Sequence, residues 1–141
     1  MNKYSRWRFA EAFEEHSSYS SALFLEHLIW AFPCPIECVQ TDNEQEFTKC
    51  FSSYGGSDQP TVFQVRLMEH GIRHKLIRLF TPRHNGKVER SHRKDNERFY
   101  ATHLFYSFED FAKQLKVYNR RDYNNFLMRP LEWKSPNEIL R

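Results

Sequence analysis

Two carboxylates that are far apart in the sequence, Asp42 and Glu89, occupy positions where an acidic side chain can do chemistry. Asp42 follows the short apolar run Ile36–Gln40, which is typical of a β-strand, and α/β sheets place catalytic groups at the C-terminal ends of their strands. Glu89 stands one turn into a predicted helix, where the helix dipole favours a negative charge. If the two carboxylates converge, their oxygens suit Mg²⁺ or Mn²⁺, which bind carboxylates together with waters and substrate phosphates.

A pair of such metal ions supports phosphodiester chemistry. Two divalent ions about 3.5–4 Å apart activate the attacking oxygen and stabilise the leaving one. The plainer interpretation is that Asp42 belongs to a turn after a strand and that Glu89 is an ordinary charge near a helix start. These two residues alone leave both interpretations open.

The distribution of charge favours a polyanionic partner. Residues 1–60 carry four Lys/Arg and nine Asp/Glu, a net charge of −5, whereas residues 61–141 carry 17 and nine, a net charge of +8. Nine basic residues fall within positions 73–98, against three acidic ones. A nucleic-acid surface has this pattern, although a solvated basic face has it too.

The composition limits the class of protein. The chain has 141 residues, of which 40% are hydrophobic and 16% aromatic, so we expect one globular domain spanning 1–141 with an aromatic core that includes the three tryptophans. The apolar runs are far shorter than the roughly 20 residues of a membrane span, and a soluble, cytoplasmic protein is expected. The three cysteines are too few for a disulfide framework and lack the spacing of a zinc site.

The residue pattern predicts an α/β fold in which helices flank a sheet. Strands are expected at Trp7–Phe13, Ile36–Gln40 and Ile72–Phe80, with helices at Ser21–Phe32, Val62–Met68, Val88–Leu104 and Phe108–Tyr123. A further helix is expected to start at Ser135, because Pro136 and Glu138 follow it as in a capping box. The segments 52–60 and 82–86 are expected to be loops.

Three blocks of the sequence together resemble the catalytic core of DDE transposases and retroviral-type integrases, most closely that of bacterial insertion-sequence transposases. The blocks are Thr41-Asp42-Asn43-x-x-Glu46-Phe47-Thr48, Gly71-Ile72-x-His74, and Pro82 to Ser91, which reads PRHNGKVERS. Ser5-Arg6 and the segment 129–138 also fit, so the resemblance covers nearly the whole chain. The first and third blocks are specific in combination, whereas either alone is a weak signal.

The resemblance implies an RNase H-like fold, a mixed sheet flanked by helices, and three acidic residues that bind Mg²⁺ or Mn²⁺. Asp42 matches the second of these residues and Glu89 the third. The 46 residues between them exceed the usual spacing of the family. We expect the loop Ser52–Pro60 to hold the excess, because loops accept insertions at small entropic cost.

The first acidic position departs from the family pattern, because Asn2 stands where relatives have an aspartate. A neutral amide removes one negative charge between two dications. Most of the first strand is expected to be missing, so we expect an integrase core domain that is incomplete at its N-terminus. Glu44 replaces a glycine that is usual in relatives, and a side chain there is expected to strain a tight turn.

Basic residues near Glu89 are the expected contacts for DNA phosphates. Phosphate contacts position a protein on DNA without reading its sequence. Ordinary surface charge is the alternative interpretation for each of them. The candidates are Lys87, Arg90, Arg93 and Lys94, together with Arg83 and Asn85 from the preceding loop.

Three functional hypotheses follow. The first is an active catalytic core for DNA integration or transposition, acting on transposon ends and target DNA, with a homo-oligomer possible and no membrane partner. The second is an inactive remnant that retains only nucleic-acid binding. The third is a protein-interaction module that reuses the fold and has neither metal dependence nor DNA affinity. Asn2 leaves the enzymatic activity open.

Overall fold

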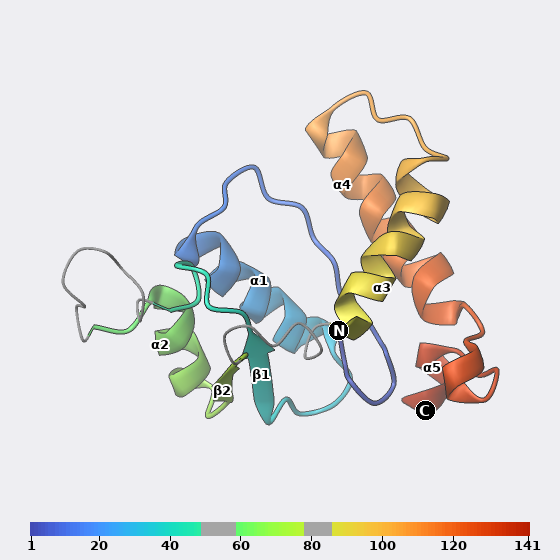
Figure 1. Cartoon of the computed structure of the whole chain (residues 1–141). Coiled ribbons are helices and arrows are strands. Elements are labelled where there is room, and N and C mark those ends of the chain that lie inside the picture. The colour runs from blue at the N-terminus through green and yellow to red at the C-terminus, as the bar shows by residue number, and fades with distance from the viewer. Residues whose placement is uncertain (49–58, 78–85) are drawn as a thin grey trace. The chain divides into compact units, whose positions relative to one another are not determined.

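A computed structural model describes residues 1–48, 59–77 and 86–141 (Figure 1). The chain divides into two compact units, and each is described by itself. One unit comprises Phe13–Pro82, and the other comprises Met1–Ala12 with Arg83–Arg141. Most of the predicted loop 52–60 and nearly all of the predicted loop 82–86 fall outside the described residues.

The unit Phe13–Pro82 contains a parallel pair of strands. Strand β1 (Cys38–Thr41) pairs with β2 (Arg73–Leu76), so that Cys38 lies opposite Arg73 and Thr41 opposite Leu76. Parallel strands need a crossover connection, and helix α2 (Val62–Glu69) lies within it. Both strands predicted here are therefore confirmed in part, over Cys38–Gln40 and Arg73–Leu76, whereas Ile36, Glu37, Ile72 and Ile77 are described and lie outside them.

Two capped helices cover this strand pair. Helix α1 (Ser18–Ala31) begins after Ser17, whose side chain accepts a hydrogen bond from the backbone N–H of Ser20. Thr61 and Gln64 form a capping box at the start of α2, which ends before Gly71 at a φ of +66°. This left-handed conformation suits glycine, as the sequence pattern predicted. The buried residues of the core come from both helices and from the start of β2: Leu25, Phe63, Leu67 and Ile72.

The other unit consists mainly of helices (Figure 1). Phe99, which is fully buried, stacks on Tyr118 with ring centroids 4.8 Å apart. The helical segment that begins with α3 therefore packs against the segment that begins with α4. Ser135 and Glu138 form the expected capping box of α5. The elements are α3 (Gly86–Asp95), η2 (Asn96–Tyr100), α4 (Phe108–Val117), η3 (Tyr118–Asp122), η4 (Tyr123–Asn125), η5 (Arg129–Leu131) and α5 (Pro136–Ile139).

The predicted strand Trp7–Phe13 is wrong, because these residues form no regular element. The backbone N–H of Arg8 donates to Asn124 Oδ1, and its carbonyl accepts hydrogen bonds from the side-chain amides of Asn119 and Asn124. Side-chain amides thus satisfy the polar backbone groups that a strand ladder would otherwise pair.

The expected α/β class agrees with this mixture of helices and a parallel strand pair. The described residues hold two strands, and the larger mixed sheet that we expected is not seen among them. The expectation that the tryptophans lie in the core is wrong for Trp30 and Trp133, whose exposed fractions are 91% and 66%. No helix in the described part of the chain has the length and apolarity that a membrane crossing requires.

A buried ion pair joins the N-terminal segment to the helices of its unit. One amino group of the Arg8 guanidinium binds Asp95 Oδ2, and Arg8 Nε donates to Asn119 Oδ1 over 2.8 Å. The guanidinium also lies 3.7 Å from the centre of the Tyr123 ring. Tyr118 donates to Asp95 Oδ1, and burial, with the charge of Asp95 adding to it, raises the pKa of Tyr118 to about 12.

We expect Asp95→Asn to lower the free energy of unfolding by about 3–5 kcal/mol, because it leaves the buried Arg8 charge without its counter-ion. Chemical denaturation followed by circular dichroism measures this loss. Glu132→Gln, which removes a negative charge from an exposed residue of the same unit, is the control and should change stability little. Equal stability of Asp95→Asn and the control would contradict the assignment. If Asp95→Asn does not fold, the double variant Arg8→Met/Asp95→Leu is expected to fold, because apolar side chains can replace a buried ion pair.

Candidate functional site

Asp42 lies in a turn that begins where β1 ends, as predicted. Its side chain is exposed, and Asp42 Oδ1 faces the backbone N–H of Glu44 at 3.5 Å. The turn is tied to the end of β2 by Asn43, which donates from Nδ2 to the carbonyl of Ile77 over 2.9 Å. The expected strain at Glu44 is wrong, because Glu44 is not among the residues with a left-handed backbone.

His74 supports this turn from the neighbouring strand. The Thr41 hydroxyl donates to the carbonyl of Asp42 over 3.0 Å, so it must accept from His74 Nε2, which lies 2.8 Å away. This arrangement requires the neutral tautomer with its proton on Nε2, or the imidazolium. Burial lowers the pKa of His74, which favours the neutral form.

A second carboxylate of the same block, Glu46, is largely shielded from solvent and lies 3.1 Å from His16 Nε2. Burial raises its pKa, the charge of His16 opposes that shift, and the nearby charges of Asp42 and Glu44 add to it. Glu46 is therefore a partner of His16 within its unit. Across the described residues, no group of three His, Cys, Asp or Glu side chains is arranged to hold a metal ion.

Glu89 lies in the first turn of α3 with its side chain exposed. Within α3 and η2, the residues Ser91, Asp95 and Phe99 are buried, so they define the face that packs inward. Arg93, four residues after Glu89, shares its face. Glu89 and Arg93 thus occupy an exposed face of the helix, as the sequence predicted.

The other basic residues of the helix lie beside this face. Lys87, Arg90 and Lys94 are spaced by three and four residues, so they follow one side of α3. Arg90 lies about 100° around the helix from Glu89 and is also three residues from Arg93, which makes these two arginines neighbours. Arg83 and Asn85, the other two expected DNA contacts, lie outside the described residues.

Asn2 is engaged in a local turn. Its Oδ1 accepts hydrogen bonds from the backbone N–H of Tyr4 and of Ser5 and from the Ser5 hydroxyl, at 3.0, 2.9 and 3.1 Å. Its backbone N–H and carbonyl bind Trp7 and Arg6. The side-chain oxygen that would have to face a metal is thus already surrounded by three donors.

The loop that contains Asn2 contacts the start of α3. Lys87 Nζ donates to the carbonyl of Lys3 over 2.7 Å, two residues before Glu89 and one after Asn2. The segments carrying the first and third expected positions therefore meet within one unit. Asp42 belongs to the other unit.

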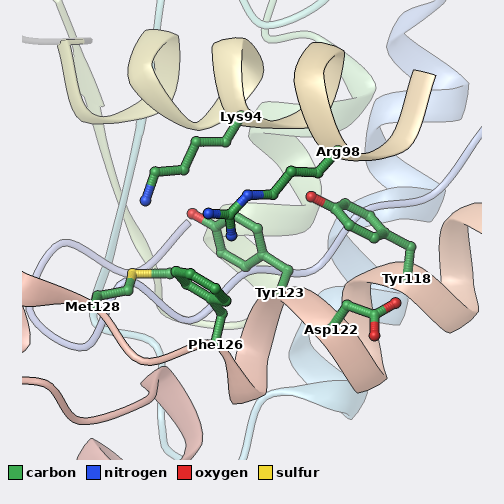
Figure 2. A pocket seen from close by; sticks show the side chains of 7 residues that line it. All are labelled: Lys94, Arg98, Tyr118, Asp122, Tyr123, Phe126 and Met128. Carbon is green, nitrogen blue, oxygen red and sulfur yellow. The ribbon is translucent and has the colours of Figure 1, made fainter. Parts of the chain in front are cut away.

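Sequence reasoning missed two residues, Arg98 and Phe126, that lie beside Lys94 at the end of α3. The Arg98 guanidinium lies 3.9 Å from the centre of the Phe126 ring, and Lys94 Nζ lies 5.6 Å from it. Figure 2 shows both cationic side chains extending over a small pocket whose floor includes Tyr123 and Phe126. The signal that could have identified Arg98 is its spacing of four residues from Lys94.

The integrase core domain is the family whose model matches this chain, over residues 70–130. The matched segment contains the whole of β2, α3 and α4, and so it includes Glu89 and the basic residues of α3. Asn2 and Asp42 lie outside it. A comparison with curated proteins gave no match.

The partly buried His74 gives the turn at Asp42 a dependence on pH. Because the folded-state pKa is lowered, the stability that neutral His74 contributes is present above about pH 6.5 and is lost as the pH falls through the folded-state pKa. NMR titration of the imidazole should show protonation of His74 below its ordinary range. An ordinary or raised pKa would contradict the structure.

The variant His74→Gln keeps a hydrogen-bonding side chain but does not titrate. We expect its melting temperature to fall less than that of the wild type between pH 7.5 and pH 5.5. His27→Gln, in the same unit, should retain the wild-type pH dependence and is the control.

Proposed function

We propose that the chain acts on DNA as the catalytic core of a DDE-type transposase or integrase, and the match of residues 70–130 to the integrase core domain supports this proposal. The proposal includes the RNase H-like fold that the family implies. Its substrates are DNA phosphodiesters at transposon ends and in target DNA, and its cofactor is Mg²⁺ or Mn²⁺.

One observation carries the proposal, namely that Glu89, within the matched segment, lies exposed in the first turn of α3. The helix dipole stabilises the ionised carboxylate there. The hydrogen bond from Lys87 to Lys3 fixes this turn against the loop of Asn2. A position of this kind lets a carboxylate reach a ligand in solvent without first breaking an internal ion pair.

The residues fit a divalent metal in part. Asp42 and Glu89 are exposed carboxylates, the oxygen ligands that Mg²⁺ and Mn²⁺ prefer, and they are the residues that would hold the metal. A bound metal would activate the attacking oxygen and stabilise the leaving one. Asn2 fits poorly, because its oxygen carries no charge and already accepts three hydrogen bonds.

The neutral, hydrogen-bonded side chain of Asn2 also favours a second candidate function, namely binding of nucleic acid without cleavage. Binding to phosphates depends on the number and position of basic side chains. Cleavage needs several oxygens arranged around metal ions. The loss of one carboxylate therefore removes cleavage before it removes binding.

Nicking of labelled duplex DNA in Mn²⁺ tests the proposal. We expect weak nicking by the wild type, none by Glu89→Gln, and about tenfold or more faster nicking by Asn2→Asp. The carboxylate in Asn2→Asp can accept the same three hydrogen bonds and adds the missing negative charge. Glu109→Gln, which removes an acidic side chain from α4, should nick at the wild-type rate.

If neither the wild type nor Asn2→Asp nicks DNA while both still bind it, the catalytic proposal is wrong and the binding function remains. If nicking is equal in the wild type and in Glu89→Gln, the activity does not come from this site.

A further inference from the structure

Lys94, near the end of α3, lies in a setting that differs from that of the other lysines. Among the lysines that the structure describes, it alone is half-buried, and the others are exposed. Its side chain extends into the pocket shown in Figure 2, and Nζ lies 5.6 Å from the centre of the Phe126 ring. The pocket has a volume of about 40 Å³, which is enough for a few atoms. The amino group is therefore partly desolvated but can still be reached by a small molecule.

The charges around Lys94 favour its neutral amine. Among the described residues, no carboxylate lies within 4 Å of its Nζ. Burial lowers the pKa of Lys94, the positive charges of Arg98, Arg6 and Arg90 lower it further, and the charge of Glu97 opposes the shift. A lysine that is desolvated beside other cations is unprotonated, and so nucleophilic, at a lower pH than an ordinary lysine.

The other groups that line the pocket set its charge. Burial raises the pKa of Tyr118 to about 12 and also raises the pKa of Tyr123, so both phenols are neutral. Asp122 is the one carboxylate among the described lining residues, and it opposes an anion there. Arg98, which lies in η2, is the second cation, and its guanidinium lies 3.9 Å from the centre of the Phe126 ring. Cation–π contact orients this guanidinium and leaves its N–H groups able to donate.

We propose that Lys94 is a carbamylation site, at which the amine reacts reversibly with carbon dioxide and Arg98 binds the product. The lone pair of the neutral Nζ forms the N–C bond, and one π pair of carbon dioxide moves onto oxygen. The nitrogen then releases a proton to water. The product is a carbamate, a planar anion that presents two oxygens as a carboxylate does. The reaction needs no oxidant or reductant and has no leaving group other than this proton.

The surroundings that disfavour the ammonium form favour the carbamate. The three arginines that repel a cation at this position attract an anion. Arg98 offers the paired N–H donors that fit a planar anion with two oxygens. Carbon dioxide is small and uncharged, so it enters the pocket without the cost of desolvating a charge. An acyl group on Lys94 would leave a neutral amide, which gains nothing from the arginines.

Carbamylation changes the charge of the Lys94 side chain from +1 to −1. A polyanion bound along α3 would therefore be repelled when carbon dioxide is abundant. The modification itself does not rest on the proposed function, because the reacting amine, the pocket and the arginine are sufficient for it.

Carbon-13 NMR of the whole chain in labelled bicarbonate at mildly alkaline pH tests the inference. We expect a carbamate resonance that disappears in Lys94→Arg and remains in Lys113→Arg, which replaces an exposed lysine of α4. Trapping of the carbamate with a trialkyloxonium salt, followed by peptide mass spectrometry, should place it on Lys94 and separate it from any carbamate on the terminal amine of Met1. Acidification should abolish the resonance, because Nζ then takes up a proton.

Two further variants test the part played by the pocket charges. Arg98→Gln should lower the fraction of carbamate about three- to tenfold, because it removes a charged hydrogen-bond donor. Asp122→Asn should raise that fraction, because it removes the carboxylate that opposes the anion. Arg141→Gln, which removes the same charge from an exposed residue of the same unit, should leave it unchanged. Thermal unfolding of each variant verifies that it is folded.

The inference is overturned if peptide mapping of the wild type finds no carbamate on Lys94, or no more than on the exposed Lys113 and Lys116. It is also overturned if Arg98→Gln and Arg141→Gln carry equal carbamate, since Arg98 would then not bind the product. These measurements use neither DNA nor a divalent metal. Failure of the nicking experiment therefore leaves this inference intact, and failure of this one leaves the proposed function intact.

Discussion

The unit that contains α3 depends on one buried charge, the guanidinium of Arg8. Burying a guanidinium costs several kcal/mol unless counter-charge and hydrogen-bond acceptors surround it. Asp95 supplies the charge, Asn119 accepts from Nε, and the Tyr123 ring lies against the guanidinium. Among the buried side-chain nitrogen and oxygen atoms of the described residues, Arg8 Nη2 alone has no hydrogen-bond partner, so the network is nearly complete. These contacts join three distant parts of the sequence.

This network also fixes the rotation of α3 about its own axis. Because Asp95 must face Arg8 and Phe99 must reach the core, the inward face of the helix is determined. Every other residue of the helix then has its direction set by the helical repeat. Glu89 and Arg93 therefore point toward solvent, whereas Lys94 is half-buried and lies over Phe126. The exposure of Glu89 is thus a consequence of the buried ion pair.

Much of the secondary structure could be predicted from local signals. Ser17, Thr61 and Ser135 cap helices as serine and threonine commonly do, and Gly71 ends α2 because its left-handed conformation suits glycine. The segment Trp7–Phe13 could not be predicted in this way. Its alternating aromatic residues indicated a strand, but the buried side chain is Arg8, whose partners lie more than 80 residues away in the sequence. No local pattern reveals such a contact.

The candidate site shows the same contrast between features that have local sequence signals and contacts between residues distant in the sequence. Asp42 at the end of β1 and Glu89 in the first turn of α3 were predicted, because a strand end and a helix start have local sequence signals. The contacts of Lys94 and Arg98 with Phe126 were not predicted, because they join residues that are far apart in the sequence. On a helix, neighbours in sequence point about 100° apart, so Arg93 and Lys94 belong to different faces. Arg98, which is farther from Glu89 in sequence, is the natural partner of Lys94 through Phe126.

A metal site and a phosphate-binding surface place different demands on a chain. A metal site needs its oxygens within a few ångströms of the ion and in the correct charge state, so one neutral residue such as Asn2 is enough to impair it. A phosphate-binding row sums contributions from separate side chains, and each loss costs only its own share. In this chain the side-chain oxygen of Asn2 carries no charge and already accepts three hydrogen bonds, which impairs a metal site but leaves contacts between basic side chains and phosphates unaffected.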